Sequence, residues 1–244
     1  MNILDIGIII FVLFGAVLGF KRGFTKELVK AVGFVAVIVV AYFLKNPLSV
    51  FLYEKLPFFK FGLFKSMEIL NILLYETIAF IICIAVLAII LKMLLLATTL
   101  FEKILNATII LGIPSKLAGA LVGLVYNFIF VFLILYVLSF TFIDNEIVYN
   151  SKFRQPILNK TPILSNLIDK SVDVIDEFIE VKNKYNDKEV SENEFNYQAF
   201  ELFLKYDVIT PETLEKLISD GKVDSFEGCI DLIKKYKEDQ NGIN

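Results

Sequence analysis

The sequence predicts an all-α membrane protein with four transmembrane helices and a soluble helical tail at the C-terminal end. Hydrophobic residues make up 57% of its 244 residues, and the mean hydropathy of +0.68 is too high for an ordinary soluble domain. The charges also separate along the chain, with a net charge of +5 over residues 1–143 and −8 over residues 144–244. Four long runs without a charged residue lie in the first part: 6–20, 31–44, 77–91 and 117–143.

Each charge-free run approaches the length of one membrane crossing once its flanks are added. A spanning helix needs about 20 apolar residues, and a flanking lysine can extend its aliphatic stem to reach the headgroups. We therefore expect transmembrane helices over about residues 3–20, 28–44, 73–95 and 117–142. The alternative is a soluble protein with four buried helices, which requires a very large soluble partner to cover them.

The first apolar run has the charge order of a membrane helix and not that of a signal peptide. A signal peptide carries positive charge before its apolar core. Here Asp5 precedes the run, whereas Lys21 and Arg22 follow it. We expect an uncleaved first membrane helix.

Glycines recur four residues apart in the first and the fourth predicted helix. Gly15 and Gly19 lie in GAVLGFKRGF, and Gly119 and Gly123 lie in GALVGLVYNF, which shares Gly, Ala, Gly and Phe at matching places. Small residues at this spacing let two helix backbones approach closely in lipid. The pattern predicts a weak internal repeat in which helices one and four pack together, or self-association through these glycine faces.

The residues after the first helix predict a turn at a basic membrane edge. Gly23 either continues the glycine spacing or ends the helix in a tight turn. Thr25 suits the N-cap of the second helix, with Glu27 in its first turn. The four cations within residues 21–30 predict that this turn is cytoplasmic and that both termini lie outside.

The connection between the second and third helices is expected to lie on the membrane surface. Residues 45–68 combine aromatic rings with four lysines, and both kinds of side chain favour the headgroup region. Pro47 and Pro57 are expected to break any helix there.

Two polar residues near or within the apolar runs have alternative interpretations. Glu76 precedes the third run and Asn127 lies in the fourth. Each is predicted to be a boundary or packing residue, and the alternative is a polar site inside the membrane.

Residues 166–244 predict an acidic amphipathic helical tail. Apolar residues recur near helical spacing over residues 163–181, and the opposite face is acidic, as on a solvated helix surface. The tail is expected to fold alone, on the membrane surface or with an unidentified protein partner. Helix ends are indicated by Ser191-x-x-Glu194, by Thr210-Pro211, by Gly221 and by a last apolar segment over about 226–236.

The sequence offers little material for catalysis. It contains no histidine, which is the commonest general base and metal ligand, and it lacks nucleotide-binding and nucleophile-elbow motifs. Its two cysteines, Cys83 and Cys229, are too few for a zinc site. The acidic tail argues against nucleic-acid binding. We expect no catalytic residues, no cofactor and no bound metal.

The opening of the chain resembles the CvpA family, the colicin V production proteins of bacterial inner membranes. The family pattern is an acidic residue before helix one, then G-x-x-x-G-F-x-R-G-F and Glu-Leu; it is matched by Asp5, Gly15, Gly19, Phe20, Arg22, Gly23, Phe24, Glu27 and Leu28. The second Gly-x-x-x-Gly of the family is met by Gly119 and Gly123, although Ser115-Lys116 stand where the family usually has Asn-Arg. The Ser and downstream Pro at the close of the family domain are matched by Ser151, Pro156 and Pro162.

The resemblance covers about residues 3–165 and implies a multi-pass membrane domain over 1–165 in the bacterial inner membrane. It implies a role in the production or secretion of colicin V-like toxins, or in envelope homeostasis, without catalytic residues. Two other classes stay open. One is an oligomeric channel or transporter subunit in which Glu76 or Asn127 faces a wet path, and the other is a membrane-anchored scaffold that recruits a partner through its acidic tail.

Overall fold

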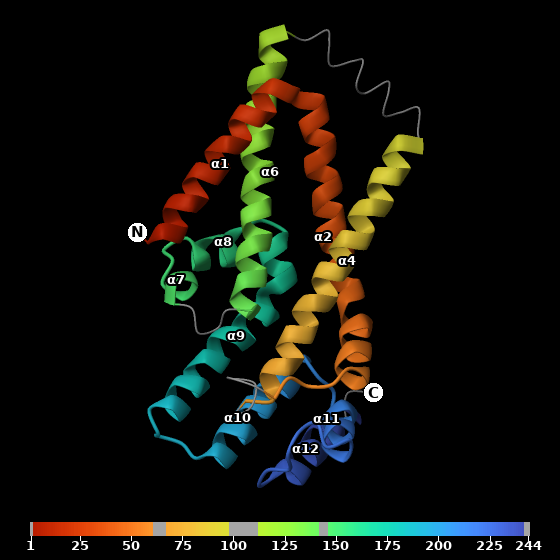
Figure 1. Ribbon diagram of the computed structural model, residues 1–244, viewed down its shortest axis with the longest axis vertical. Coiled ribbons are helices and arrows are strands. Elements are labelled where there is room, and N and C mark those ends of the chain that lie inside the picture. The colour runs from red at the N-terminus through yellow and green to blue at the C-terminus, as the bar shows by residue number, and fades with distance from the viewer. Residues whose placement is uncertain (1, 61–66, 98–111, 142–145, 242–244) are drawn as a thin grey trace. The chain divides into compact units, whose positions relative to one another are not determined.

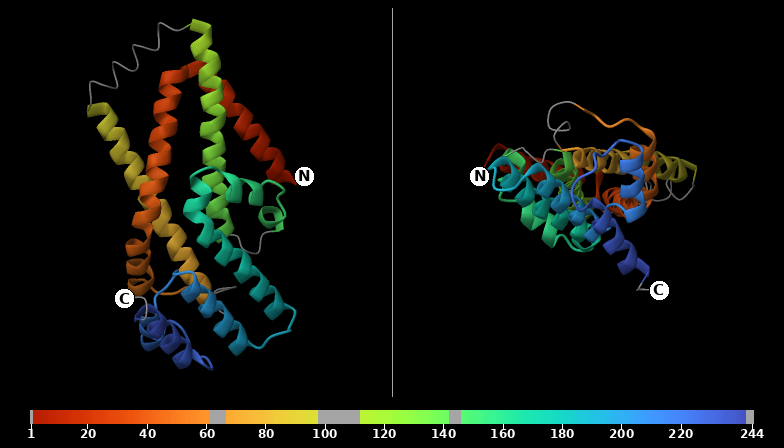
Figure 2. Two further views of the ribbon diagram at one scale, coloured as in Figure 1. Left: turned by 180° about the vertical axis from the view of Figure 1, so that it is seen from behind. Right: turned by 90° about the horizontal axis from the view of Figure 1, so that it is seen from below.

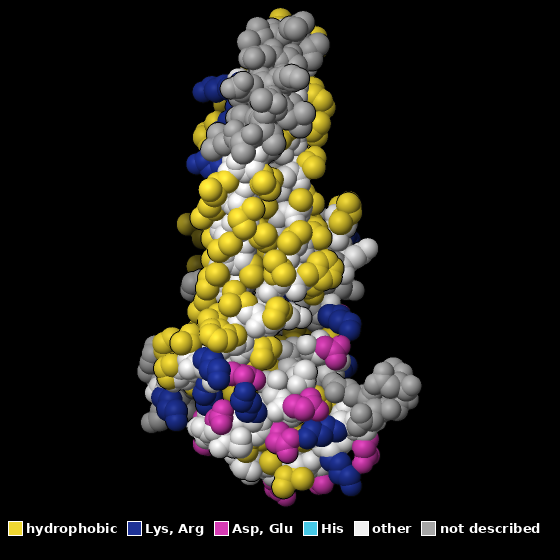
Figure 3. Space-filling view, turned by 90° about the vertical axis from the view of Figure 1, so that its right-hand side faces the viewer, with side chains coloured by type: hydrophobic (Ala, Val, Ile, Leu, Met, Phe, Trp, Pro, Cys, Tyr) yellow, Lys and Arg dark blue, Asp and Glu magenta, His cyan; other side chains and the backbone are white. Residues whose placement is uncertain are grey.

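The computed structural model describes residues 2–60, 67–97, 112–141 and 146–241, and within these ranges it contains helices and no strands (Figure 1). Four helices are long and apolar enough to cross a membrane: α1 (Ile3–Arg22), α2 (Phe24–Lys55), α4 (Ile69–Ala97) and α6 (Gly112–Thr141). Apolar side chains cover the long helices on the face drawn in Figure 3. The predicted all-α membrane fold is confirmed.

The chain divides into two compact units. The first comprises residues 1–48 and 77–167, and the second comprises residues 49–76 and 168–244. The break near residue 167 lies close to the predicted start of the tail at residue 166. The second unit nevertheless includes the end of α2 and the beginning of α4, which the sequence had assigned to the membrane domain.

The first unit is built around α1 and α6, which cross near the turn between α1 and α2 and separate toward the N-terminal end of α1 (Figure 1 and the left view of Figure 2). The N-cap Asn2 and Asp5 form a reciprocal capping box at the start of α1. Aromatic rings pack between the long helices of this unit. The Phe34 ring stacks on Phe130 with their centroids 5.5 Å apart, and the Phe130 and Phe11 centroids are 5.7 Å apart. These contacts join α1, α2 and α6.

Two sequence expectations about α2 are wrong. The helix begins at Phe24 and not after Thr25, because Gly23 alone makes the turn. It also continues through Pro47 to Lys55, although residues 45–68 were expected to form a loop broken at that proline. A proline inside a helix removes one main-chain hydrogen bond and can be accommodated as a bend when the neighbouring turns remain bonded.

The described residues that follow α2 fold against the start of α4. The backbone N–H of Phe59 donates to the Asn71 side-chain oxygen at 2.7 Å, and the Tyr75 hydroxyl donates to the Pro57 carbonyl at 2.6 Å. Residues 61–66 of the expected surface loop, the connection 98–111 and residue 142 at the expected end of the fourth helix lie outside the described residues.

The helices of the tail follow the sequence signals closely. Two short helices, α7 (Glu146–Tyr149) and α8 (Arg154–Lys160), precede α9 (Leu164–Asn186), α10 (Glu192–Lys205), α11 (Pro211–Ser219) and α12 (Cys229–Asn241). Ser191 caps α10 and Thr210 caps α11, as predicted. The core of this part of the second unit is aromatic, with the Phe200 and Phe226 rings stacked at 5.3 Å.

Candidate functional site

The site defined by the sequence motif begins with a close crossing of α1 and α6 backbones. A Cβ atom built on Gly19 would collide with the carbonyl oxygen of Gly119, and one on Gly15 would collide with that of Gly123. The reverse also holds, since a Cβ on Gly119 would lie 2.5 Å from the Gly19 oxygen. All four glycines are buried. The structure therefore brings the two glycine pairs together within one chain.

In this crossing the glycine faces of α1 and α6, which the sequence also made candidates for self-association, are buried against each other. An oligomer held through the same glycines would require α1 and α6 to separate first. Of the two interpretations of the spacing, the packing of helix one on helix four is the one that the structure contains.

Asn127 completes the crossing. Its side-chain nitrogen donates to the Phe11 carbonyl at 2.7 Å, and its Cγ atom would lie 2.6 Å from a Cβ on Gly15. The amide is thus seated over Gly15 and hydrogen-bonded to α1, which is a packing role. Glu76, the other predicted polar residue, is 8% exposed on the part of α4 that belongs to the second unit.

A buried hydrogen bond joins the two ends of the family domain. The Ser151 hydroxyl donates to Asp5 Oδ1 at 2.6 Å, and Asp5 Oδ2 accepts from the Asn2 backbone N–H at 2.9 Å. The Asn2 side-chain amide donates to the Ile147 carbonyl, also at 2.6 Å. Asp5 is fully buried, so these partners satisfy a carboxylate that is costly to bury alone.

The turn between α1 and α2 is held by two hydrogen bonds. Gly23 ends α1 with φ +82°, a conformation that favours glycine, and its N–H donates to the Gly19 carbonyl. The first N–H of α2, from Phe24, donates to the Ser115 hydroxyl of α6 at 3.3 Å. Ser115 therefore has a structural partner at the position where the sequence departs from the family pattern.

A charge cluster, which we call the turn cluster, lies at the same end of the unit and consists of Arg22, Glu27 and Lys30. The Glu27 side chain is 1% exposed, whereas Arg22 and Lys30 are 41% and 43% exposed. Arg22 Nη1 lies 3.4 Å and Lys30 Nζ 3.7 Å from Glu27 Oε1. Lys30 also lies over the Tyr126 ring at 4.4 Å. One buried carboxylate thus orients two partly exposed cations.

Sequence reasoning missed Arg154. This side chain is 1% exposed; its Nε donates to the Ser139 hydroxyl at 2.9 Å, and its guanidinium lies 5.2 Å from the Tyr149 ring. Ser139 is near the C-terminal end of α6, where a cation is favoured by the helix dipole. One signal was available: the chain has only two arginines, Arg22 and Arg154, among its 24 basic residues.

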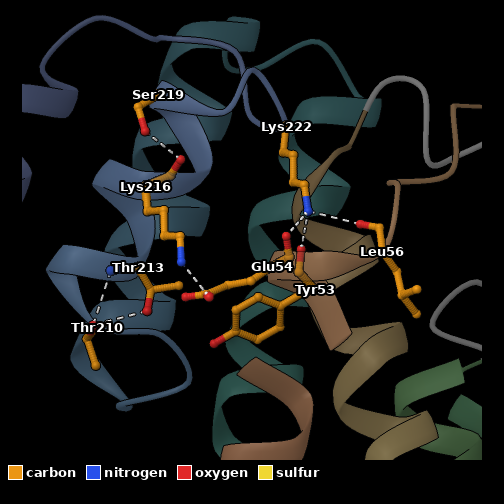
Figure 4. A network of polar contacts seen from close by, with 8 residues as sticks. All are labelled: Tyr53, Glu54, Leu56, Thr210, Thr213, Lys216, Ser219 and Lys222. Atoms are coloured by element: carbon orange, nitrogen blue, oxygen red, sulfur yellow. Dashed lines mark hydrogen bonds and ion pairs between the residues drawn. The ribbon is translucent and has the colours of Figure 1, made fainter. Parts of the chain in front are cut away.

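The second unit contains a separate polar network, shown in Figure 4. The Lys222 ammonium donates to the carbonyls of Tyr53, Glu54 and Leu56 at 2.8, 2.5 and 3.0 Å. Lys216 of α11 pairs with the Glu54 carboxylate at 2.6 Å. The tail therefore binds the C-terminal end of α2, where helix carbonyls otherwise lack partners. Partial burial lowers the pKa of the Lys222 ammonium.

These features define an all-α membrane protein whose helical core is closed by a glycine crossing and by a hydrogen bond between its two ends. The chain belongs to the family described as Colicin V production protein, whose sequence model matches residues 4–162. A relative from Bacillus subtilis (strain 168), "Uncharacterized transmembrane protein YshB", is 32% identical over 171 residues, which cover 68% of this chain and 94% of the relative. No solved structure matches the chain. The predicted family membership is confirmed.

Proposed function

We propose that this protein is a non-enzymatic, multi-pass component of the bacterial inner membrane that supports the production or secretion of colicin V-like toxins, or envelope homeostasis. The observation that carries the proposal is the use of the motif residues: Asp5, the four glycines, Arg22 and Glu27 all contact other parts of the same chain. The family description supports the connection with toxin production.

A core of this kind suits a structural role in the membrane. Three polar side chains of the first unit join separate parts of the chain: Asn127 binds α1, Ser115 binds the start of α2, and Ser151 binds Asp5. A catalytic site requires polar groups positioned toward a substrate. The proposed activity is accordingly to hold or organise other envelope components.

The experiment is complementation of a strain that lacks the gene. Gly19→Ile, which forces a side chain into the α1–α6 crossing, is compared with Gly7→Ala, which adds a Cβ on the same helix with no atom within 4 Å. The secreted amount of a small peptide toxin and survival under envelope stress are measured at equal membrane levels of protein. Loss of both phenotypes in Gly19→Ile alone supports the proposal, and wild-type phenotypes in both variants contradict it.

A second candidate is a membrane-anchored scaffold that recruits a partner through its tail. It is favoured by an open groove of about 550 Å³ on α10 and the residues before α12, lined by Tyr197, Glu194, Glu201 and Glu227 among others. The groove suits a basic partner segment. Glu194→Lys with Glu227→Lys should abolish complementation in that case, whereas Glu238→Lys, outside the groove, should not. Full activity of the double variant would contradict the scaffold.

The channel alternative has less support. Asn127, one of the two residues proposed to face a wet path, is buried and hydrogen-bonded to α1. Ion or solute flux in liposomes that survives both Glu76→Gln and Asn127→Leu would remove these residues from any path.

A further inference from the structure

Residues 146–163, which include α7 and α8, are attached to the beginning of α1; we call them the α7–α8 segment. The Asn2 amide, at the N-cap of α1, donates to the Ile147 carbonyl at 2.6 Å. The Ser151 hydroxyl donates to Asp5, one turn into the helix, at 2.6 Å. The segment belongs to the same compact unit as α1 and lies beside the N-terminal end of that helix (Figure 1).

The α7–α8 segment is also attached to the end of α6. Arg154 is buried, and its Nε donates to the Ser139 hydroxyl at 2.9 Å, two residues before α6 ends at Thr141. The 20 residues of α1 make it about 30 Å long at ~1.5 Å per residue, which is the thickness of the hydrocarbon core. One end of α1 lies at the basic turn to α2, so its other end reaches the opposite edge of the hydrocarbon. The segment is therefore held at one surface of the bilayer.

Apolar side chains of the α7–α8 segment are exposed at this level. Ile147 and Tyr149 are 48% and 39% exposed, and Ile163 is 71% exposed. Ile163 also has φ +69°, a conformation that is rare for a β-branched residue. Isoleucine gains nothing from contact with water, whereas apolar and tyrosine side chains are both favoured at the boundary between headgroups and acyl chains.

The charge and direction of the α7–α8 segment also suit the bilayer surface. Lys152 and Lys160 are exposed, and a lysine can lay its aliphatic stem along an apolar surface while its ammonium stays near lipid phosphates. In Figure 1 and the left view of Figure 2, α8 is directed across α6 and not along it. A helix that lies in the plane of the interface has this direction relative to a spanning helix.

We propose that the α7–α8 segment is embedded in the headgroup region of the bilayer, with Ile147, Tyr149 and Ile163 in contact with lipid. The partner is the lipid surface, because hydrogen bonds hold the segment where α1 and α6 leave the hydrocarbon, so that it continues their lipid-facing surface. This inference goes beyond the proposed role in toxin production, since it assigns a lipid contact outside the spanning helices whatever the cellular task.

The test uses the full-length protein in vesicles of phosphatidylcholine and phosphatidylglycerol in equal parts, with Cys83→Ser and Cys229→Ser as the background. Ile147→Cys and Ile163→Cys are each labelled with a polarity-sensitive fluorophore. Lipids that carry a spin label near the headgroup end of an acyl chain should quench the emission at both positions, and aqueous iodide should quench it little. Leu13→Cys, an exposed position of α1, is the lipid-facing control, and the same fluorophore on free cysteine is the aqueous reference.

Lowering the protein-to-lipid ratio distinguishes the bilayer from a second copy of the chain. Quenching by the spin-labelled lipid should stay unchanged, because lipid remains in excess. Iodide quenching equal to that of the free-cysteine adduct, without quenching by the lipid label, would overturn the proposal. So would protection from both quenchers that is lost on dilution, because it would assign this surface to contact between copies. The two positions are read independently, so a folding defect in one variant leaves the other as the test.

Discussion

Gly19 illustrates how a single missing side chain determines the approach of two helices. Because its Cα faces the backbone of α6, replacement by isoleucine must push α1 and α6 apart. We expect a loss of at least about 1–3 kcal/mol in the free energy of unfolding, the range seen for overpacked cores. Thermal unfolding in detergent measures it.

Gly7→Ala is the matched control for that substitution. Gly7 lies on the same helix and has open space around it, so alanine should be neutral or stabilising by up to about 1 kcal/mol through helix propensity. Equal destabilisation by the two substitutions would show that the effect comes from α1 itself and not from its crossing with α6.

The Asp5–Ser151 hydrogen bond predicts a coupling between residues 146 positions apart. Ser151→Ala should destabilise the protein by about 1.5–3 kcal/mol, the range for a hydrogen bond to a charged group. Asp5→Asn introduced into the Ser151→Ala variant should lower the free energy of unfolding much less than Asp5→Asn does in the wild-type protein. A double-mutant cycle measures this, and additive effects would contradict the coupling.

The structural roles of residues that recur at a regular spacing could be predicted from the sequence, whereas the roles of isolated residues could not. The glycine spacing indicated that helices one and four pack closely, because a four-residue interval places small residues on one helix face. Nothing in the local sequence showed that Arg154 would be buried beside Ser139, or that Ser115 would bind the first N–H of α2. These contacts join residues that are brought together only by the tertiary fold.

At the scale of elements, the end of α2 depends on the tail. Lys222→Gln should destabilise the last turn of α2 by about 1–3 kcal/mol, because it weakens or removes ammonium bonds to the Tyr53 and Glu54 carbonyls of that turn and to the Leu56 carbonyl just after it. Hydrogen exchange of amides 49–56 in the full-length protein reports the change. Lys234→Gln removes an exposed lysine of α12 and should leave that exchange unaltered.

The contact between α9 and α10 predicts a dependence on pH. The Tyr206 hydroxyl and then Lys205 bind the Glu177 carboxylate and lower its pKa. A lowered folded pKa contributes stability above the unfolded pKa, and this contribution is lost as the pH falls through the folded pKa. Because Glu177 is 40% exposed, this contribution to the free energy of unfolding should stay below about 1 kcal/mol.

Tyr206→Phe should therefore speed hydrogen exchange of α9 amides in the full-length protein at neutral pH. The difference from wild type should vanish in acid, once Glu177 is protonated in both proteins. Tyr236→Phe serves as the control on α12. A difference that persists unchanged into acid would contradict the role of Glu177.

Element boundaries were predictable where capping chemistry is local. Ser191 and Thr210 begin α10 and α11 as their side chains indicated, since an N-cap satisfies backbone N–H groups within three residues. The continuation of α2 through Pro47 was not predictable. A proline inside a helix usually ends it, and the sequence does not show that the helical turns on both sides of Pro47 continue. Residues 49–76 belong to the same unit as the tail because of long-range contacts such as that of Lys222 with Tyr53, which the local sequence does not show.

At the scale of the whole molecule, the charge distribution predicts that both termini lie outside the cell. Cys229 is buried and therefore poorly suited to labelling, whereas the neighbouring Ile230 side chain is 76% exposed. The probe is Ile230→Cys in a background of Cys83→Ser and Cys229→Ser. A membrane-impermeant maleimide should label this residue in intact cells. Labelling that appears only after lysis would place the tail in the cytoplasm and contradict the predicted orientation.

The central claim is that α1 and α6 cross within one chain in the membrane. The most direct measurement is oxidative cross-linking of Phe11→Cys with Phe130→Cys, whose native rings are 5.7 Å apart, in the background without Cys83 and Cys229. Leu13→Cys with Phe130→Cys is the control, since Leu13 is 57% exposed. The account predicts a disulfide within the monomer for the first pair alone. Cross-linked dimers without a monomeric disulfide would contradict it and assign the glycine faces to an oligomer.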